Sequence, residues 1–281
     1  MVGELRRVLV CPPNRAGWCN VADWRGMSYL RQPDCETAQR QHDRLCEQLR
    51  AAGAELFSLD ESSGHSADAV YTHDAAFLTD HGVICMSMGK TCREGEPAAH
   101  RRFFEKLGIP VIGEVQSPGT VEAGDMIWLD ARTLLAGRGY RTNAAGIAQL
   151  REIMRPLGIE VLSAPLPHSA GPGCCLHLMS LISLLDEHTA LVDLPWIAVE
   201  TVELLRERGF RFVEIDPGER ATLACNVLSL GKGRLLAIEE NANTNARLRH
   251  AGFDVRTFPA SEIGINGGGG PTCLTRPILR S

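Results

Sequence analysis

Near the end of the chain the sequence reads Gly267-Gly268-Gly269-Gly270-Pro271-Thr272-Cys273, followed by a strand-like run at 274–279. Four consecutive glycines add no side-chain packing, but they permit positive φ and let other atoms approach the backbone closely. Pro271 then restricts φ and removes a backbone donor. A cysteine presented at the mouth of a strand by such a loop is placed as a nucleophile would be. The alternative is a linker ending in a buried structural cysteine, because free cysteines often behave as small core residues.

Working outward from this run, five segments have helical apolar periodicity, and each ends at a glycine followed at once by an apolar strand. Glycine commonly ends helices because it adopts the left-handed conformation without a Cβ clash. Asp34 and Asn143 are expected to cap the first and third helices, and Pro195 to open the fourth. The terminating glycines lie 55, 50, 51 and 43 residues apart, at Gly53, Gly108, Gly158, Gly209 and Gly252.

Pairs of apolar runs with a hairpin pattern separate these strands from the next helices. Four pairs lie at 75–78 with 83–86, 126–129 with 133–136, 178–185 with 189–192, and 226–230 with 234–238. The fifth would pair 273–279 with 5–10, so one unit is split between the chain ends. A period near 50 residues marks a modular array, and a split unit predicts a closed ring without exposed terminal edges. We therefore expect one α/β domain spanning 1–281 and built from five units.

The residues that open the hairpins form an unusual polar set. Their spacings are 51, 52, 49 and 47 residues, and Glu122 lies just before the second of them: Asp74, Asp125, His177, Asn226 and Cys273. Equivalent strand ends of a closed ring point at one axis. The sequence therefore predicts that two or three carboxylates, an imidazole, an amide and a thiol meet at the centre.

These side chains suggest a chemistry. A thiol nucleophile needs a base or a cationic neighbour, because a free thiol is mostly protonated at neutral pH. His177 is the natural partner, although it could instead be a core histidine bonded to backbone. Glu122 and Asp125 could merely form a turn before a strand, but with Asp74 they suit a buried cation that must be paired. A guanidinium offers five planar N–H donors and an electrophilic carbon.

Two arginines and one long loop complete the candidate site. Arg93 and Arg141 follow hairpins and would bind a substrate carboxylate if they face the axis; the alternative is ordinary surface charge. A guanidinium at one end and a carboxylate at the other describe arginine and its derivatives. The loop at 12–33 is long enough to act as a lid, or it is a packed surface loop held by Trp18 and Trp24.

Composition excludes several classes of function. The 281 residues are 44% hydrophobic and 22% charged with net charge −5, which is ordinary for a globular protein. There is no Lys/Arg block for nucleic acid, no apolar run of about 18 residues for a membrane span and no export leader. The ten cysteines are scattered without zinc-type spacing. We expect a cytoplasmic chain with mostly buried free thiols and no metal or cofactor.

At this point several segments resemble a known family. The 267–273 segment looks like the C-terminal catalytic motif of the guanidine-modifying enzymes, which include arginine deiminases, dimethylarginine dimethylaminohydrolases and amidinotransferases. Glu122-Ala123-Gly124-Asp125 resembles their EGGD motif with Ala for the first Gly, and 175–178 resembles their histidine segment. The 139–143 segment resembles the dimethylargininase RTN segment, and Arg93 lies at that family's spacing from Asp74. The resemblance covers the whole chain and implies the pentein fold, an α/β-propeller of five ββαβ units.

The resemblance also implies roles for the residues. Cys273 would attack the guanidinium carbon to give a covalent thiouronium, and His177 would protonate the leaving amine and then activate water. Glu122 would orient His177. The expected substrate-binding residues are Asp74, Arg93, Arg141 and Asp125.

Two departures from the family bear on the substrate. Met179 stands where deiminases and amidinotransferases carry an acid, which favours a methylated guanidinium, whereas His73 stands where dimethylargininases carry one. We expect hydrolysis of N-methylated arginine to citrulline and an alkylamine. Arginine deiminase or amidinotransferase activity on arginine or another guanidino compound is the alternative. A non-catalytic scaffold of the same fold is disfavoured by the acidic charge and by Cys273 and His177 together. The expected partner is a small guanidino molecule, with no nucleic acid or membrane, and a homo-oligomer is left open.

Overall fold

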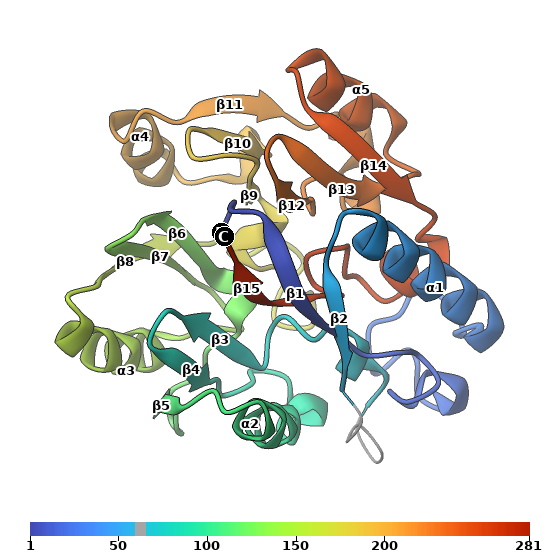
Figure 1. The fold of residues 1–281 in the computed structure, drawn as a ribbon, viewed down its shortest axis with the longest axis horizontal. Helices are drawn as coiled ribbons and strands as arrows, with labels where there is room; N and C mark the ends of the chain where they lie inside the picture. Colours follow the sequence, from blue (N-terminus) through green and yellow to red (C-terminus); the bar gives the residue numbers. More distant parts are fainter. Residues whose placement is uncertain (60–65) are drawn as a thin grey trace.

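The computed structural model describes residues 1–59 and 66–281. Five three-stranded sheets surround a central axis, and a helix lies outside each sheet (Figure 1). In order along the chain the sheets are β15(Arg276–Arg280)-β1(Leu5–Val10)-β2(Glu55–Ser58), β3(Ala76–Thr79)-β4(Gly82–Cys85)-β5(Val111–Glu114), β6(Met126–Asp130)-β7(Thr133–Arg138)-β8(Glu160–Pro165), β9(Ile182–Leu184)-β10(Thr189–Val192)-β11(Arg211–Glu214) and β12(Leu228–Gly231)-β13(Arg234–Ile238)-β14(Asp254–Phe258). The helices are α1(Cys35–Ala51), α2(Glu96–Lys106), α3(Ala144–Met154), α4(Val199–Glu207) and α5(Ala242–His250).

Each sheet repeats one connection. The two strands of a hairpin pair antiparallel, and a helix then returns the chain to a third strand that is parallel to its neighbour. The first strand of each hairpin lies toward the centre and the helices lie on the rim (Figure 1). The predicted α/β-propeller of five ββαβ units is confirmed.

The glycines that end the helices behave as expected. Their φ angles are all positive, between 69° and 95°, at Gly53, Gly108, Gly158, Gly209 and Gly252. Asp34 caps α1 by accepting from the backbone N–H groups of Glu36 and Thr37, and Asn143 caps α3. The prediction that Pro195 opens the fourth helix is wrong, because Pro195 lies in a separate 3₁₀ turn and α4 begins only at Val199. Ala198 is extended, which interrupts the helical conformation between the two.

The two ends of the chain close the ring. Leu5 of β1 pairs with Arg280 of β15, and Leu9 pairs with Arg276. The backbone N–H of Glu4 donates to the carbonyl of Ser281 at 2.8 Å, and the reverse bond measures 3.0 Å. Leu5 and Leu9 are almost fully buried, so hydrophobic packing and main-chain pairing hold the split unit together.

The glycine run serves close approach more than conformational freedom. Within 267–270 only Gly268 has a positive φ, at 86°. A Cβ on Gly267 would lie 2.0 Å from the Tyr71 hydroxyl, and one on Gly269 would lie 2.5 Å from the Tyr71 ring. The expectation that these glycines permit positive φ and close approach is confirmed, because Gly268 has a positive φ and Tyr71 leaves no room for a side chain at Gly267 or Gly269.

Two of the cysteines expected to be free are paired. Cys19 and Cys35 form a disulfide with a Cα–Cα distance of 4.8 Å, because the long loop returns to the start of α1. Of the eight cysteines outside this disulfide, only half are buried, so the expectation that most of the thiols are buried is half right: Cys11, Cys46, Cys85 and Cys225. Among the described residues, no helix is both long and apolar enough to cross a bilayer.

The 12–33 loop is fastened to several other segments, including 261–266, which accepts hydrogen bonds from Arg31. The Tyr29 hydroxyl donates to Asp68 at 3.0 Å, and the Ser28 hydroxyl donates to the carbonyl of Gly173. The Met27 carbonyl accepts from Lys90 Nζ at 2.9 Å. Trp18 packs edge-on against Tyr29. A lid movement of this loop stays a prediction.

Candidate active site

Glu122 and His177 form the centre of the site. Glu122 precedes a 3₁₀ turn at Ala123–Asp125, and His177 caps another at Leu178–Ser180. The Glu122 Oε2 and His177 Nε2 atoms are 2.7 Å apart, and both side chains are buried. The backbone N–H of Gly89 donates to Glu122 Oε1 at 2.9 Å, so the carboxylate is held at both oxygens.

Asp74 lies on the other side of the imidazole. Its Oδ1 atom is 4.0 Å from His177 Nδ1 and accepts from the backbone N–H of Gly124 at 3.1 Å. Its Oδ2 atom accepts from Arg93 Nη1 at 2.7 Å. The imidazole therefore lies between two fixed carboxylates.

Gly124 is the residue that permits this arrangement. A Cβ at this position would lie 2.6 Å from His177 Nδ1 and 2.8 Å from Asp74 Oδ1. The neighbouring position is occupied by Ala123, whose methyl group is accommodated and fully buried. Of the two glycines in the EGGD motif, the geometry therefore requires the second, which is Gly124 in this chain.

Cys273 is held beside this group. Its Sγ atom accepts a hydrogen bond from Asn226 Nδ2 at 2.9 Å, and its carbonyl accepts from the backbone N–H of His73 at 3.1 Å. Burial and the Asp74 carboxylate raise the pKa of the Cys273 thiol to about 12, against the lowering effect of His177 and Asn226. A cationic substrate would favour the thiolate by the same Coulombic logic.

Electrostatics favour a charged pair at His177. Burial lowers the pKa of His177, but Cys175, Asp74 and Asp125 outweigh burial and raise it well above its usual value. Burial raises the pKa of Glu122, but the hydrogen bond and charge of His177 and the charge of Arg141 lower it overall. The free site therefore favours an imidazolium, which can protonate a leaving group.

Asp125 supports the turn that carries the histidine. Its Oδ1 atom accepts from the backbone N–H of Leu178 at 2.8 Å, and the side chain is fully buried. Burial raises the pKa of Asp125 to about 6. Its contacts are with the protein, next to His177.

The two predicted arginines lie in the site with different partners. Arg93 is buried and donates to Asp74, to Glu96 through Nε and Nη2, and to the carbonyl of Tyr71. Arg141 donates through Nη1 to Glu122 at 3.2 Å. Among the described residues Arg141 Nε and Nη2 have no hydrogen-bond acceptor, so only Arg141 has a free edge.

The site residues lie on turns and not on the first residues of strands. Cys273 precedes β15 by three positions, and His177 precedes β9 by five, with a 3₁₀ turn between. Such turns direct backbone N–H groups at the buried carboxylates, as at Gly124 and Leu178. Buried charges require such partners.

The sequence did not indicate three contributors to the site. Cys175 Sγ lies 3.8 Å from His177 Nδ1, Glu96 binds Arg93, and Tyr71 lies against the glycine run. The i, i+3 spacing of Arg93 and Glu96 could have suggested an ion pair. Position relative to a hairpin could not reveal Cys175 or Tyr71.

The same donors could hold a metal ion. Asp74, Glu122 and His177 each offer one ligand atom, and these atoms lie within 4.8 Å of one another. Imidazole and carboxylate are common ligands of transition metals. Because His177 Nε2 already pairs with Glu122, a metal there would compete with this hydrogen bond.

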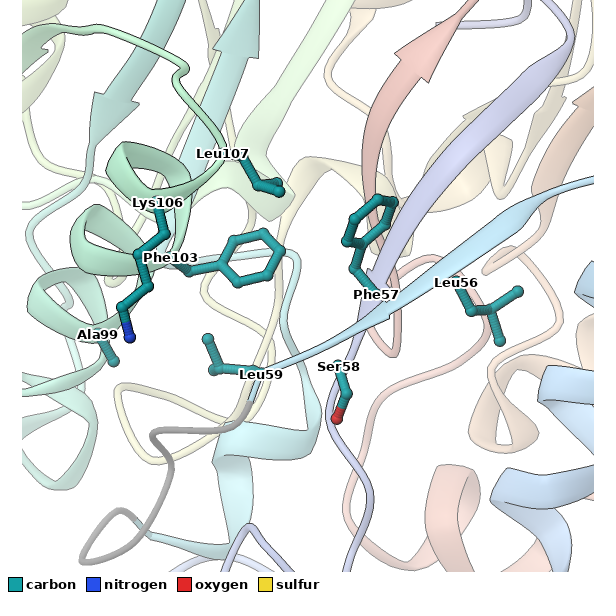
Figure 2. A pocket seen from close by; sticks show the side chains of 8 residues that line it. All are labelled: Leu56, Phe57, Ser58, Leu59, Ala99, Phe103, Lys106 and Leu107. Carbon is teal, nitrogen blue, oxygen red and sulfur yellow. The ribbon is translucent and has the colours of Figure 1, made fainter.

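An apolar groove lies elsewhere on the molecule. It has a volume of about 330 Å³ and runs between β2 and α2 (Figure 2), with Phe57 and Phe103 ring centroids 6.3 Å apart. Leu56, Leu59 and Leu107 also line it. It contains none of the polar residues described above, so it is separate from the candidate active site.

Comparison with known proteins agrees with this geometry. The family model for "N,N dimethylarginine dimethylhydrolase, eukaryotic" matches residues 29–280. An N(G),N(G)-dimethylarginine dimethylaminohydrolase from Streptomyces coelicolor is 30% identical over 194 residues, covering 67% of this chain and 71% of that protein. An arginine deiminase from Listeria welshimeri is 24% identical over 253 residues, covering 75% of this chain and 61% of that protein.

The fold also matches solved structures. The N-terminal domain of ArgZ, a cyanobacterial arginine dihydrolase bound to product, superimposes with a TM-score of 0.83 at 23% identity. The match covers 99% of this chain and 98% of that one. At this identity the likeness establishes the shared fold.

Proposed function

The chain belongs to the N,N dimethylarginine dimethylhydrolase family, and from that premise we propose that it hydrolyses an N-methylated L-arginine to citrulline and an alkylamine. Membership of this family makes the chain a guanidino hydrolase that acts on C–N bonds. The buried Glu122–His177 hydrogen bond of 2.7 Å, with Asp74 on the other side of the ring, is the observation that supports hydrolysis, and the hydrophobic packing of Met179 supports a methylated guanidinium.

In the proposed reaction the Cys273 thiolate attacks the guanidinium carbon and forms a C–S bond. The tetrahedral adduct breaks one C–N bond, and the alkylamine leaves with a proton from His177. Neutral His177 then takes a proton from water, the hydroxide adds to the carbon, and the C–S bond breaks. The proton of the added hydroxyl passes to solvent, where the free alkylamine takes one up, and citrulline leaves with the thiolate and the imidazolium restored.

We assign the guanidinium to Asp74 and Glu122, because both are buried carboxylates beside His177. His73 adds no charge there, since its Nδ1 atom bonds the carbonyl of Thr275 and its Nε2 atom faces Arg276. Met179 is packed in a hydrophobic cluster. Few acceptors around the guanidinium favour a methylated nitrogen, which offers fewer donors than NH₂.

We assign the substrate carboxylate to Arg141, because its Nε and Nη2 atoms can present a planar fork. Arg93 was expected to share this role. In the proposal it holds Asp74 and Glu96 instead, since four of its five donors already meet protein oxygens. Asp125 was also expected to contact substrate, but in the proposal it supports the turn that carries His177.

Arginine hydrolysis is the second candidate, favoured by the similarity to an arginine deiminase. Its guanidinium would need acceptors for an unsubstituted NH₂ group, which Asp74 and Glu122 would supply. Amidino transfer to an amine acceptor would use the same covalent intermediate. A cytoplasmic location and self-association stay predictions.

Product analysis tests the proposal. The purified chain would be incubated with L-arginine, monomethyl-L-arginine and asymmetric dimethyl-L-arginine, and citrulline, ammonia, methylamine and dimethylamine would be quantified. We expect citrulline with methylamine or dimethylamine, and none from C273S. Ammonia from arginine at a higher kcat/KM than any methylated substrate would replace the first candidate by the second.

A further inference from the structure

We propose that Asn226 is a positioning residue that donates a hydrogen bond to the Cys273 sulfur and holds it as the attacking thiolate. The inference rests on the proposed function, because it concerns the same nucleophile. Asn226 occupies the one hairpin-opening position to which the mechanism above gives no task. Its Nδ2 atom lies 2.9 Å from Cys273 Sγ, and its side chain is buried.

The orientation of the amide is fixed by chemistry. The backbone N–H of Thr272 lies 3.0 Å from Asn226 Oδ1, and a peptide N–H can only donate. The oxygen of the amide must therefore face Thr272, which leaves the NH₂ group to face the sulfur. A flipped amide would place two donors together and an oxygen against the sulfur.

The glycine run makes room for this contact. A Cβ on Gly270 would lie 2.7 Å from both Cγ and Oδ1 of Asn226, so only glycine allows the amide to sit there. The Thr272 hydroxyl adds a bond to the carbonyl of Val227 at 3.1 Å. The segment that carries the nucleophile is thus tied to residues 226 and 227 by three hydrogen bonds.

The sulfur needs such a donor. Burial raises the pKa of Cys273, and the Asp74 charge raises it further, so the thiolate is disfavoured in the free enzyme. His177 Nε2 is committed to Glu122. Among the described residues, Asn226 is the side chain that hydrogen-bonds Sγ. A donor binds a thiolate more strongly than a thiol, so removing it raises the pKa of Cys273 and slows attack.

The test measures the thiolate without any guanidino substrate. Alkylation of Cys273 by iodoacetamide would be followed by peptide mass spectrometry across pH in wild type, N226D and N226L. N226D keeps the acceptor for Thr272 and removes the donor, whereas N226L removes both. We expect the pH midpoint of alkylation to rise by about one unit or more in both variants, with a rate at neutral pH at least about tenfold lower.

Thr272→Val is the matched control. It removes the hydroxyl bond to Val227 and leaves the Asn226–Cys273 contact, so its melting temperature should fall while its alkylation midpoint stays. If N226D and N226L lower the melting temperature without moving the midpoint, Asn226 is only structural and the inference is wrong. If N226L does not fold, the smaller neutral variant N226A decides, because N226D also adds a negative charge that raises the pKa of Cys273 by itself. A shifted midpoint in a protein that releases no citrulline from any guanidino compound would overturn the proposed function and leave this inference standing.

Discussion

His177 Nε2 and Glu122 Oε2 lie 2.7 Å apart, and both side chains are buried. The carboxylate fixes the ring so that Nδ1 faces Asp74. It also stabilises the imidazolium, which is the form that can hand a proton to a leaving amine. The predictions below follow from this pair and its surroundings.

Replacing Glu122 by Gln should shift the pH dependence of turnover. The neutral amide stabilises the imidazolium less, so the pKa of His177 falls and the alkaline limb of the kcat profile moves to lower pH. We expect kcat to drop by about 100- to 10,000-fold at neutral pH. Glu114→Gln, at an exposed residue that pairs with Arg101 on the surface, should leave the profile in place. An unchanged alkaline limb in E122Q would argue against the assigned role.

Replacing Gly124 by Ala should disable the site with little loss of fold. The added methyl would lie 2.6 Å from His177 Nδ1 and must displace the ring or Asp74. Because small misplacements of catalytic groups cost about 100-fold, kcat/KM should fall by at least that factor. Ala123→Gly, one residue away, should keep activity within about twofold and cost about 1 kcal/mol of stability. Kinetics and thermal melts of both variants test the contrast, and equal activity in the two would contradict it.

Replacing Arg141 by Ala should weaken the binding of substrates that carry an α-carboxylate. A charge-assisted hydrogen bond contributes about 1.5–3 kcal/mol, so kcat/KM for methylated arginine should fall by about 10- to 100-fold. The loss should be smaller for the decarboxylated analogue, a methylated agmatine, because only the contact to Glu122 is then removed. Exposed Arg138→Ala is the control. The same fold-loss for both substrates would mean that Arg141 does not bind the carboxylate.

Removing the Cys19–Cys35 disulfide should destabilise the protein. The bond joins residues with a sequence separation of 16. For a loop of this length, the lost entropy of the unfolded chain stabilises the folded state by about 3 kcal/mol. Cys35→Ser should lower the unfolding free energy by about this amount, and dithiothreitol should reproduce the loss in wild type. Cys92→Ser, at an exposed free thiol, should change stability by less than about 0.5 kcal/mol. Identical urea curves for wild type and C35S would contradict the pairing.

The sequence predicted the ring because its signals are local and repeated. A glycine after each helix must adopt positive φ wherever the chain turns back, so Gly53 and its four counterparts mark the units reliably. The meeting of Asp74 and His177 followed from the period, and that of Glu122 from its place just before Asp125. Pro195 misled because proline opens a 3₁₀ turn as readily as an α-helix.

Contacts between particular side chains could not be read from the sequence. Nothing in the spacing of Cys19 and Cys35 marks them as a pair among ten cysteines. The task of Gly267 depends on the Tyr71 hydroxyl, which is nearly 200 positions away. Arg93 has the predicted location, and its i, i+3 spacing allows a pair with Glu96, but only the buried geometry shows that this pair occupies donors expected to bind substrate.

The pairing of β1 with β15 bears on how the polypeptide could be rewired. Residues 4 and 281 already lie side by side, with hydrogen bonds between Glu4 and Ser281 in both directions. A short linker could join them, and the chain could be opened instead at the exposed turn at 186–188, since circular permutation is tolerated where ends are adjacent and superficial. Such a permutant would carry Cys273 in mid-chain and make the β15-β1-β2 blade continuous in sequence, while the β9-β10-β11 blade would be split between the new ends and the order of blades around the axis would be unchanged.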